Sequence, residues 1–141
     1  YMDVVALVAP IGIFFGRIAN FINSELYGVA TNVNWAVIFV QVDNLPRHPS
    51  QIYEALLEGI ILFLILIYFR SKNFLDKPGL ISSLFLIFYS IFRFCVEFFR
   101  TPDDHIGYIF LNLTIGQVIS LIFLLLGIIL FYFKNENCKI N

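Results

Sequence analysis

The chain has 141 residues, of which 60% are hydrophobic, 18% are aromatic and only 13% are charged, and its formal net charge is −1. Soluble domains average roughly 45–50% apolar and about 25% charged residues, so this composition and the mean hydropathy of +0.85 indicate an integral membrane protein. The small net charge argues against a nucleic-acid-binding protein, because nucleic acid binding calls for a basic patch.

The two cysteines, Cys95 and Cys138, lie in an apolar run and in a polar tail. This placement gives neither a disulfide framework nor the spacing of a metal site. The first residue is Tyr1, and no cleavable signal pattern follows it. We therefore expect the chain to be a fragment that lacks an N-terminal part.

The first apolar run covers 4–22, with Pro10 inside it and Arg17 near its end. Crossing the hydrocarbon core of a bilayer takes about 20 apolar residues. The run therefore predicts a membrane helix over 4–22 that holds Arg17 near one interface.

Polar residues mix with Val, Ile, Trp and Phe between 23 and 51. The β-branched and aromatic residues from Val29 to Val42 favour an extended backbone, and 43–46 is rich in turn residues. We predict a small extramembrane segment here, with one or two short strands.

Three more apolar runs follow, at about 52–69, 80–99 and 110–133, and each is long enough to cross a bilayer. Ser50 is expected to cap the first of them. The sequence thus predicts an all-α polytopic membrane protein with about four transmembrane helices, forming a single membrane domain over 1–141.

Basic residues gather on one side of the predicted bundle. By parity the loop 70–79 and the C-terminal tail share a side, which the positive-inside tendency makes cytoplasmic. The Arg17 stretch, the Arg47-His48 pair and the loop 103–105 then lie on the outer face, so one site can draw on all three. The basic residues behind this prediction are Arg70, Lys72, Lys77, Lys134 and Lys139.

Tyr89, Arg93 and Glu97 are spaced by four residues, and Arg100 follows shortly after. On a helix these side chains lie along one side. An arginine inside a membrane helix normally faces a partner or a wet cavity. Two interpretations are open. Either an Arg93–Glu97 salt bridge fixes helix packing, or Glu97 and Tyr89 orient Arg93 toward a phosphate, which a guanidinium binds bidentately.

Glu54 and Glu58 make a second pair with the same spacing. Glu54 is expected to neutralise an arginine across the bundle, whereas Glu58 lies deeper, which suits it to proton transfer. His48 and His105 flank the bundle on the outer side, where a loop histidine is usually solvated or hydrogen-bonded. Together with the scattered carboxylates they do not form a metal site.

The stretch 16–28 places an arginine, two asparagines and a glutamate at the end of an apolar helix. Polar groups cost free energy there unless something pairs with them. We expect this stretch to hold an anionic ligand, although Asn20 and Asn23 equally suit the cap of the first helix. Combined with the other arginines, the pattern indicates recognition of a phospholipid headgroup, and a transporter, an enzyme and a scaffold are all compatible with it.

The same stretch resembles the signature of the bacterial prolipoprotein diacylglyceryl transferases. The shared pattern runs from Gly16-Arg17 through Asn20-Phe21-Ile22-Asn23 to Glu25 and Gly28. Two further blocks, 47–55 and 93–100, agree with the family, as does Gly116-Gln117 in the last run. These blocks occur in the family's order along nearly the whole chain.

The resemblance implies a reaction in the bacterial inner membrane, at a site facing the periplasm. The family transfers the diacylglyceryl group of phosphatidylglycerol to the lipobox cysteine thiol of a prolipoprotein, and it uses no metal or other cofactor. The product is a thioether, and glycerol phosphate leaves. The nucleophile belongs to the substrate protein, and the group that removes its proton is left open.

The resemblance also implies roles for individual residues. Arg93, held by Tyr89 and Glu97, would stabilise charge on the departing phosphate. Arg17 would bind the lipid phosphate and act in catalysis with them. The residues expected to bind phosphatidylglycerol are Arg17, Asn20, Glu25, Gly28 and Arg100.

Members of the family are about twice as long as this chain, with several helices and a histidine-containing motif ahead of the Gly-Arg stretch. The chain is therefore expected to be the C-terminal half, with a separate N-terminal half as a partner beside membrane lipids and the lipobox segment. The alternative is a non-catalytic phospholipid-binding module or an inactive fragment.

Overall fold

The computed structural model describes residues 1–73, 76–101, 108–110 and 113–137. Its elements follow one another in a simple order, with one long helix divided into α, π and α parts. They are α1 (Met2–Ile22), β1 (Val37–Ile38), β2 (Pro46–Arg47), α2 (Ser50–Glu54), η1 (Ala55–Ile61), α3 (Leu62–Ser71), α4 (Leu80–Glu97), β3 (Tyr108–Phe110), β4 (Leu113–Thr114) and α5 (Ile115–Asn137).

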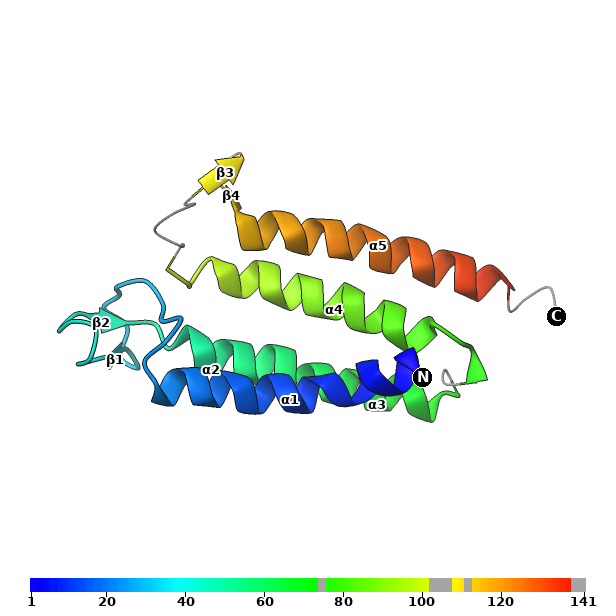
Figure 1. Ribbon diagram of the computed structural model, residues 1–141, viewed down its shortest axis with the longest axis horizontal. Helices are drawn as coiled ribbons and strands as arrows, with labels where there is room; N and C mark the ends of the chain where they lie inside the picture. The colour runs from blue at the N-terminus through cyan, green and yellow to red at the C-terminus, as the bar shows by residue number, and fades with distance from the viewer. Residues whose placement is uncertain (74–75, 102–107, 111–112, 138–141) are drawn as a thin grey trace.

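Four long helices dominate the structure and run side by side along its long axis (Figure 1). Each is long and apolar enough to cross a membrane: Met2–Ile22, Ser50–Ser71, Leu80–Glu97 and Ile115–Asn137. The α5 helix packs along α4, and α1 packs on η1 and α4. The predicted all-α, multi-pass architecture is confirmed, including the strand-containing segment after the first helix.

The last helix begins later than the predicted 110. Residues Tyr108–Phe110 and Leu113–Thr114 pair as antiparallel strands, and α5 starts at Ile115 and ends at Asn137. Thr114 and Gln117 explain the start, because the Thr114 N–H donates to Gln117 Oε1 (3.1 Å) and the Gln117 N–H donates to Thr114 Oγ1 (3.3 Å). This reciprocal pair is a capping box.

Two other predicted boundaries also need correction. The helix predicted over 80–99 ends at Glu97, and the helix predicted from 52 begins at Ser50. Pro49 rather than Ser50 is the capping residue, and the Ser50 hydroxyl instead donates to the Leu26 carbonyl (3.2 Å). Ser50 thereby ties the start of α2 to the chain leaving α1.

The end of the bundle opposite the β1–β2 strands is held by Asp3 at the start of α1. Its carboxylate accepts hydrogen bonds from the Gly79 N–H (2.7 Å), the Ser82 N–H (2.9 Å) and the Ser82 hydroxyl (2.6 Å). These N–H groups open α4, whose own N-cap residue, Gly79, has no side chain to offer. Asp3 therefore caps a helix that is distant in sequence.

The apolar core lies next to this cap, between α1, α3 and α4. It contains Ala6, Leu7, Leu62, Leu66, Ile81 and Leu84. Most of the polar residues predicted for the site lie toward the other end of the helices, whereas Tyr89 packs against this core.

At the site end, backbone hydrogen bonds join three segments that are far apart in sequence. The Gly28 N–H donates to the His48 carbonyl (3.1 Å) and the Val29 N–H donates to the Phe99 carbonyl (3.0 Å). The segment after α1 thus lies between the entry to α2 and the exit from α4. These connections hold the site ends of the helices together.

Replacing Gly28 with alanine is expected to destabilise the protein by about 1–3 kcal/mol, as overpacking does. A Cβ atom at this position would collide with the His48 carbonyl oxygen and lie 2.7 Å from the Phe99 carbonyl oxygen. Both obstacles are backbone, which cannot rotate away. Reversible unfolding in detergent micelles measures the effect.

The matched control is Gly12→Ala in α1, where an added Cβ meets nothing within 4 Å. This change is expected to leave stability unchanged or to raise it by up to about 1 kcal/mol through helix propensity. Equal stability of the Gly28 and Gly12 variants would contradict the close backbone packing at the site end.

Candidate active site

Arg17, Glu54 and Arg93 meet between α1, α2 and α4. One carboxylate oxygen, Glu54 Oε2, lies 2.7 Å from Arg17 Nε and 2.9 Å from Arg93 Nη1. The Glu54 side chain is 0% exposed, and those of Arg17 and Arg93 are 17% and 14% exposed. Glu54 therefore neutralises arginines across the bundle, as predicted, and it holds two of them close together.

Glu97 continues this cluster toward α5. Its Oε2 lies 3.4 Å from Arg93 Nη2 and 3.8 Å from Arg100 Nη1, and its Oε1 accepts a hydrogen bond from the Thr114 hydroxyl (3.1 Å). Arginines and carboxylates thus alternate from α1 to the end of α4. The predicted Arg93–Glu97 salt bridge is present, and Arg93 also has a partner on another helix.

Two glycines let the helices approach the cluster closely. A Cβ at Gly59 would lie 2.8 Å from Phe14 Cβ, so α1 crosses the π-helical turn at this point. A Cβ at Gly116 would lie 2.9 Å from the Glu97 carboxyl carbon, so the first turn of α5 rests on that carboxylate. The first contact is with an aromatic side chain, and the second is with a charged one.

The chain that leaves α1 is tied to the start of α2. Ser24 and Leu26 adopt left-handed backbone angles, with φ of 57° and 53°. The Gln51 side-chain amide donates to the Glu25 carbonyl (2.6 Å), beside the Ser50–Leu26 hydrogen bond. This sharp turn keeps the Arg17 end of α1 against Glu54.

The cluster keeps hydrogen-bond donors for a further anion. A guanidinium has five N–H donors in a planar fork. Within the described residues, Arg17 contacts Glu54 through Nε, so its two Nη groups remain for another acceptor. Because both arginines are partly exposed, a phosphate can bind between them with charge-assisted hydrogen bonds.

Three predicted lipid-binding residues, Asn20, Glu25 and Gly28, lie at the C-terminal end of α1 and in the segment that follows it. The Asn20 carbonyl accepts a hydrogen bond from the Glu25 N–H (2.9 Å), and the Glu25 side chain is exposed. Gly28 is buried in the backbone connections described above. Asn23 is the C-cap residue of α1, which agrees with the capping interpretation.

His48 belongs to a separate aromatic cluster. Its ring packs edge-on against Phe99 (5.1 Å between centroids), and its Nδ1 lies 3.0 Å from the Tyr53 hydroxyl. The Trp35 indole donates to that same hydroxyl (2.7 Å). His105 and its neighbours Asp103 and Asp104 lie outside the described residues.

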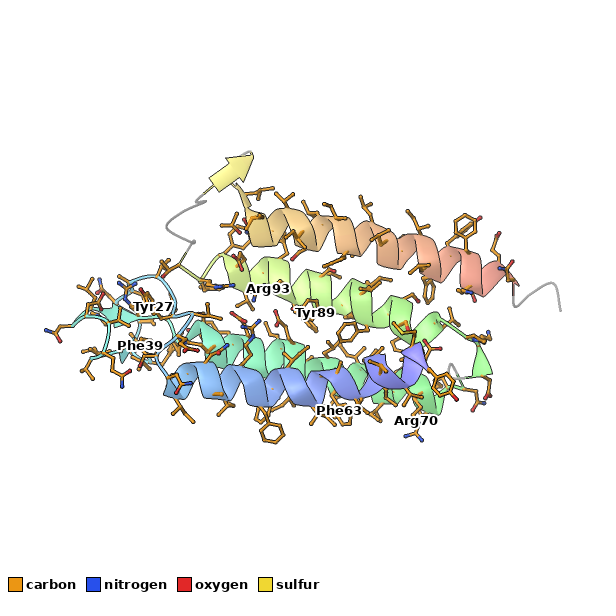
Figure 2. The ribbon with its side chains drawn as sticks, in the orientation of Figure 1. Tyr27, Phe39, Phe63, Arg70, Tyr89 and Arg93 are labelled. Carbon is orange, nitrogen blue, oxygen red and sulfur yellow. The ribbon has the colours of Figure 1, made fainter. Side chains whose placement is uncertain are left out.

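Tyr89 and Glu58 lie one helical turn deeper than the arginine–carboxylate cluster. Tyr89 stacks on Phe85, with ring centroids 5.5 Å apart, while Arg93 has Glu54 and Glu97 as its ion-pair partners. Figure 2 shows Arg93 and Tyr89 extending from α4 toward the layer of α1 and α2. Glu58 is 0% exposed.

A comparison with models of protein families places the chain in a family. The family model described as prolipoprotein diacylglyceryl transferase matches residues 1–133. The chain belongs to this family.

Curated members of the diacylglyceryl transferase family are similar to the chain over most of its length. The protein from Rickettsia bellii, named phosphatidylglycerol–prolipoprotein diacylglyceryl transferase, is 58% identical over 129 residues, which cover 91% of this chain and 49% of the relative. Relatives with the same name from Rickettsia akari (56% identical, 89% and 49% covered) and Rhodospirillum rubrum (53%, 92% and 48%) agree. The chain spans about half the length of these relatives.

Membership of the diacylglyceryl transferase family confirms the resemblance drawn from the sequence, while the roles of individual residues stay predictions. One site residue was missed. Thr114 donates to Glu97, and the pattern Thr114-x-x-Gln117 before an apolar run is the signal that would have identified it. No comparable sequence pattern identified Asp3 as the residue that caps α4.

Outside the membrane-spanning helices of this family member, Asp43 and Arg47 form an ion pair with 2.6 Å between Oδ2 and Nη2. The side-chain hydrogen bonds from Arg47 lower the pKa of Asp43 from its ordinary value, and the Leu45 N–H adds to this. Since the folded pKa is the lower one, the pair stabilises the fold above the unfolded value of about 3.9, and its contribution is lost as pH falls through the folded pKa.

An NMR titration of Asp43 is expected to show this lowered pKa in the native chain. In Arg47→Gln the Asp43 pKa is expected to return toward its ordinary value, because the main cause of the shift is gone. An Asp43 pKa that is the same in both proteins would contradict the ion pair.

Proposed function

We propose that this chain carries out diacylglyceryl transfer from phosphatidylglycerol to the lipobox cysteine of prolipoproteins, within a membrane enzyme of which it is one half. The observation that carries the proposal is the convergence of Arg17 and Arg93 on a single oxygen of Glu54. Two guanidiniums held together at the end of membrane helices suit the phosphate of a phospholipid. The names of the relatives supply the substrates.

In the proposed mechanism, the lipid phosphate bridges Arg17 and Arg93. The thiol sulfur of the prolipoprotein attacks the glyceryl carbon that carries the phosphate, and the carbon–oxygen bond breaks. Arg93 stabilises the charge that develops on the departing glycerol phosphate. Glu54 and Glu97 act as positioning residues that hold Arg93 in place without touching the lipid.

The other predicted residues complete the proposed site. Arg100, which contacts Glu97, adds positive charge at the entrance. Asn20, Glu25 and Gly28 shape the headgroup end through the turn that follows α1. Tyr89 closes the deeper side below Arg93.

The site is proposed to face the periplasm from the bacterial inner membrane. Arg70 supports this orientation, because it lies at the end of the bundle opposite the strands β1 and β2 (Figure 2). Lys72 follows α3 at that end, and the Lys134 side chain packs near Gly79. Positive residues gather on the cytoplasmic side of membrane proteins.

The test places this chain in the Rickettsia bellii relative, in exchange for the 49% of that protein that it matches. The purified chimera receives phosphatidylglycerol and a lipobox peptide, and mass spectrometry measures the thioether product. Product formation is expected. A chimera that makes no product while the intact relative does would overturn the proposal.

A second candidate is a phospholipid-binding module without catalytic activity. Arg17 and Arg93, both held by Glu54, suit a phosphate whether or not a reaction follows. The same assay on the isolated chain separates the two, because a module binds phosphatidylglycerol and forms no product. Recovery of activity when the remaining part of the relative is added as a separate polypeptide would identify that part as a partner.

A further inference from the structure

Glu58 is a buried carboxylate to which the ion-pair cluster gives no partner. Its side chain is 0% exposed, and within the described residues neither Oε1 nor Oε2 has a hydrogen-bond partner. A buried carboxylate normally carries several hydrogen bonds, and an unsatisfied one is costly. An unsatisfied buried polar group in a native protein often has a catalytic role or binds a group that completes its hydrogen bonds.

The backbone around Glu58 is also unusual. It lies in the middle of η1 (Ala55–Ile61), and the Leu62 N–H that follows reaches back to the Leu57 carbonyl, five residues earlier. Single π-helical turns inside α-helices are rare and frequently occur at functional sites. Glu54 and Glu58, four residues apart, lie along the same side of this helix.

Charged groups from three helices face Glu58. Arg17 on α1 and Arg93 on α4 interact with it electrostatically, as do the carboxylates of Glu54 and Glu97. The Tyr89 hydroxyl group on α4 also interacts electrostatically with Glu58. Glu54 Oε1, on the same side of the helix, likewise has no hydrogen-bond partner among the described residues. Unused acceptors therefore lie beside unused arginine donors.

Glu58 lies deeper in the bundle than the arginines, so it would meet a different part of a bound lipid. Glu58 lies four residues, close to one helical turn, further along the helix than Glu54. A phospholipid whose phosphate binds the arginines directs its acyl chains toward the membrane centre. The glyceryl carbon that joins phosphate and chains then lies next to the level of Glu58, where the thiol must attack.

We propose that Glu58 removes the proton from the attacking thiol, an inference that rests on the proposed function. The S–H bond breaks as its proton passes to a Glu58 carboxylate oxygen, and the sulfur forms a bond to the glyceryl carbon. The carbon–oxygen bond breaks, and its electron pair leaves with the phosphate. The proton then passes from Glu58 to the released glycerol phosphate, which restores the carboxylate without any oxidant or reductant.

A peptide with selenocysteine in place of the lipobox cysteine tests this role. A selenol is ionised at neutral pH and needs no base, whereas a thiol with a pKa of about 8.5 does. In the chimera, Glu58→Gln is expected to slow transfer to the cysteine peptide by about 100-fold or more, as loss of a general base does. Transfer to the selenocysteine peptide is expected to stay within a few-fold of the unsubstituted chimera.

Two control variants make the comparison specific. Arg93→Ala is expected to lose transfer to both peptides, because leaving-group stabilisation is needed in each case. Ser90→Ala removes a buried hydroxyl whose hydrogen bond goes to the Leu86 carbonyl within the same helix, and it is expected to change neither rate. Equal losses with both peptides in Glu58→Gln, or no loss with either, would overturn the role of Glu58.

A pH profile and a second variant separate chemistry from folding. In Glu58→Gln the residual rate with the cysteine peptide is expected to rise with pH up to the pKa of the thiol, because only the ionised fraction reacts. Glu58→Asp keeps a carboxylate and is expected to recover part of the rate. An unchanged pH profile would overturn the inference alone, whereas an inactive unsubstituted chimera would overturn the proposed function together with it.

Discussion

Replacing Arg93 with alanine is expected to lower the rate of diacylglyceryl transfer in the chimera by about 1000-fold or more. Loss of one donor to a developing negative charge already costs about 100- to 1000-fold. Arg93 also contacts Glu54 at 2.9 Å and Glu97 at 3.4 Å, so its removal disturbs both neighbouring carboxylates. Product measured by mass spectrometry at saturating phosphatidylglycerol gives the rate.

Lysine at position 93 is expected to fail almost as completely. A lysine ammonium is a point charge, and it lacks the planar fork that reaches two carboxylates and a phosphate together. Arg70→Ala, an exposed arginine at the opposite end of the bundle, serves as the control and is expected to keep full activity. Activity of Arg93→Lys close to that of the unsubstituted chimera would show that charge alone is sufficient.

Removing the carboxylate of Glu54 is expected to have the largest effect on stability. Breaking a buried ion pair by removing one partner typically costs about 3–5 kcal/mol, because the remaining charge is left uncompensated. In Glu54→Ala two arginines lose the same partner, and both are mostly buried. We therefore expect a free-energy loss at the upper end of this range, measured by reversible unfolding in mixed micelles.

Glu136→Gln is the matched control for that measurement, since Glu136 is an exposed carboxylate near the end of α5. It is expected to change the free energy of unfolding by less than about 0.5 kcal/mol, as surface substitutions usually do. If Glu54→Ala were no more destabilising than this control, the shared oxygen would not hold α1 and α4 together.

Local patterns in the sequence were sufficient for the architecture and for part of the site. Apolar runs of membrane-spanning length predicted the four helices, because the bilayer imposes its thickness on every span. The four-residue spacing of Arg93 and Glu97 predicted their salt bridge, because helix geometry is local. The expectation that Glu54 neutralises an arginine followed from the cost of an unpaired buried charge.

Local sequence patterns could not predict the features that depend on tertiary contacts. No spacing rule indicates that Arg17 and Arg93 share one oxygen of Glu54, since that depends on how three helices pack. The cap that Asp3 gives α4 joins residues 76 positions apart. The π-helical turn around Glu58 has no sequence signature, and the strands at 108–114 were hidden by an apolar run that suits a helix equally well.

If Arg17 and Arg93 form one phosphate-binding site, as proposed, a double-mutant cycle will reveal it. Phosphatidylglycerol binding to the chimera is measured for the unsubstituted protein, for Arg17→Ala, for Arg93→Ala and for both changes together. Residues that act as a unit give strongly non-additive effects. The prediction is that each single change weakens binding about 10-fold or more and that the second change adds little. Fully additive losses would place the two arginines in separate sites and contradict a shared phosphate-binding site.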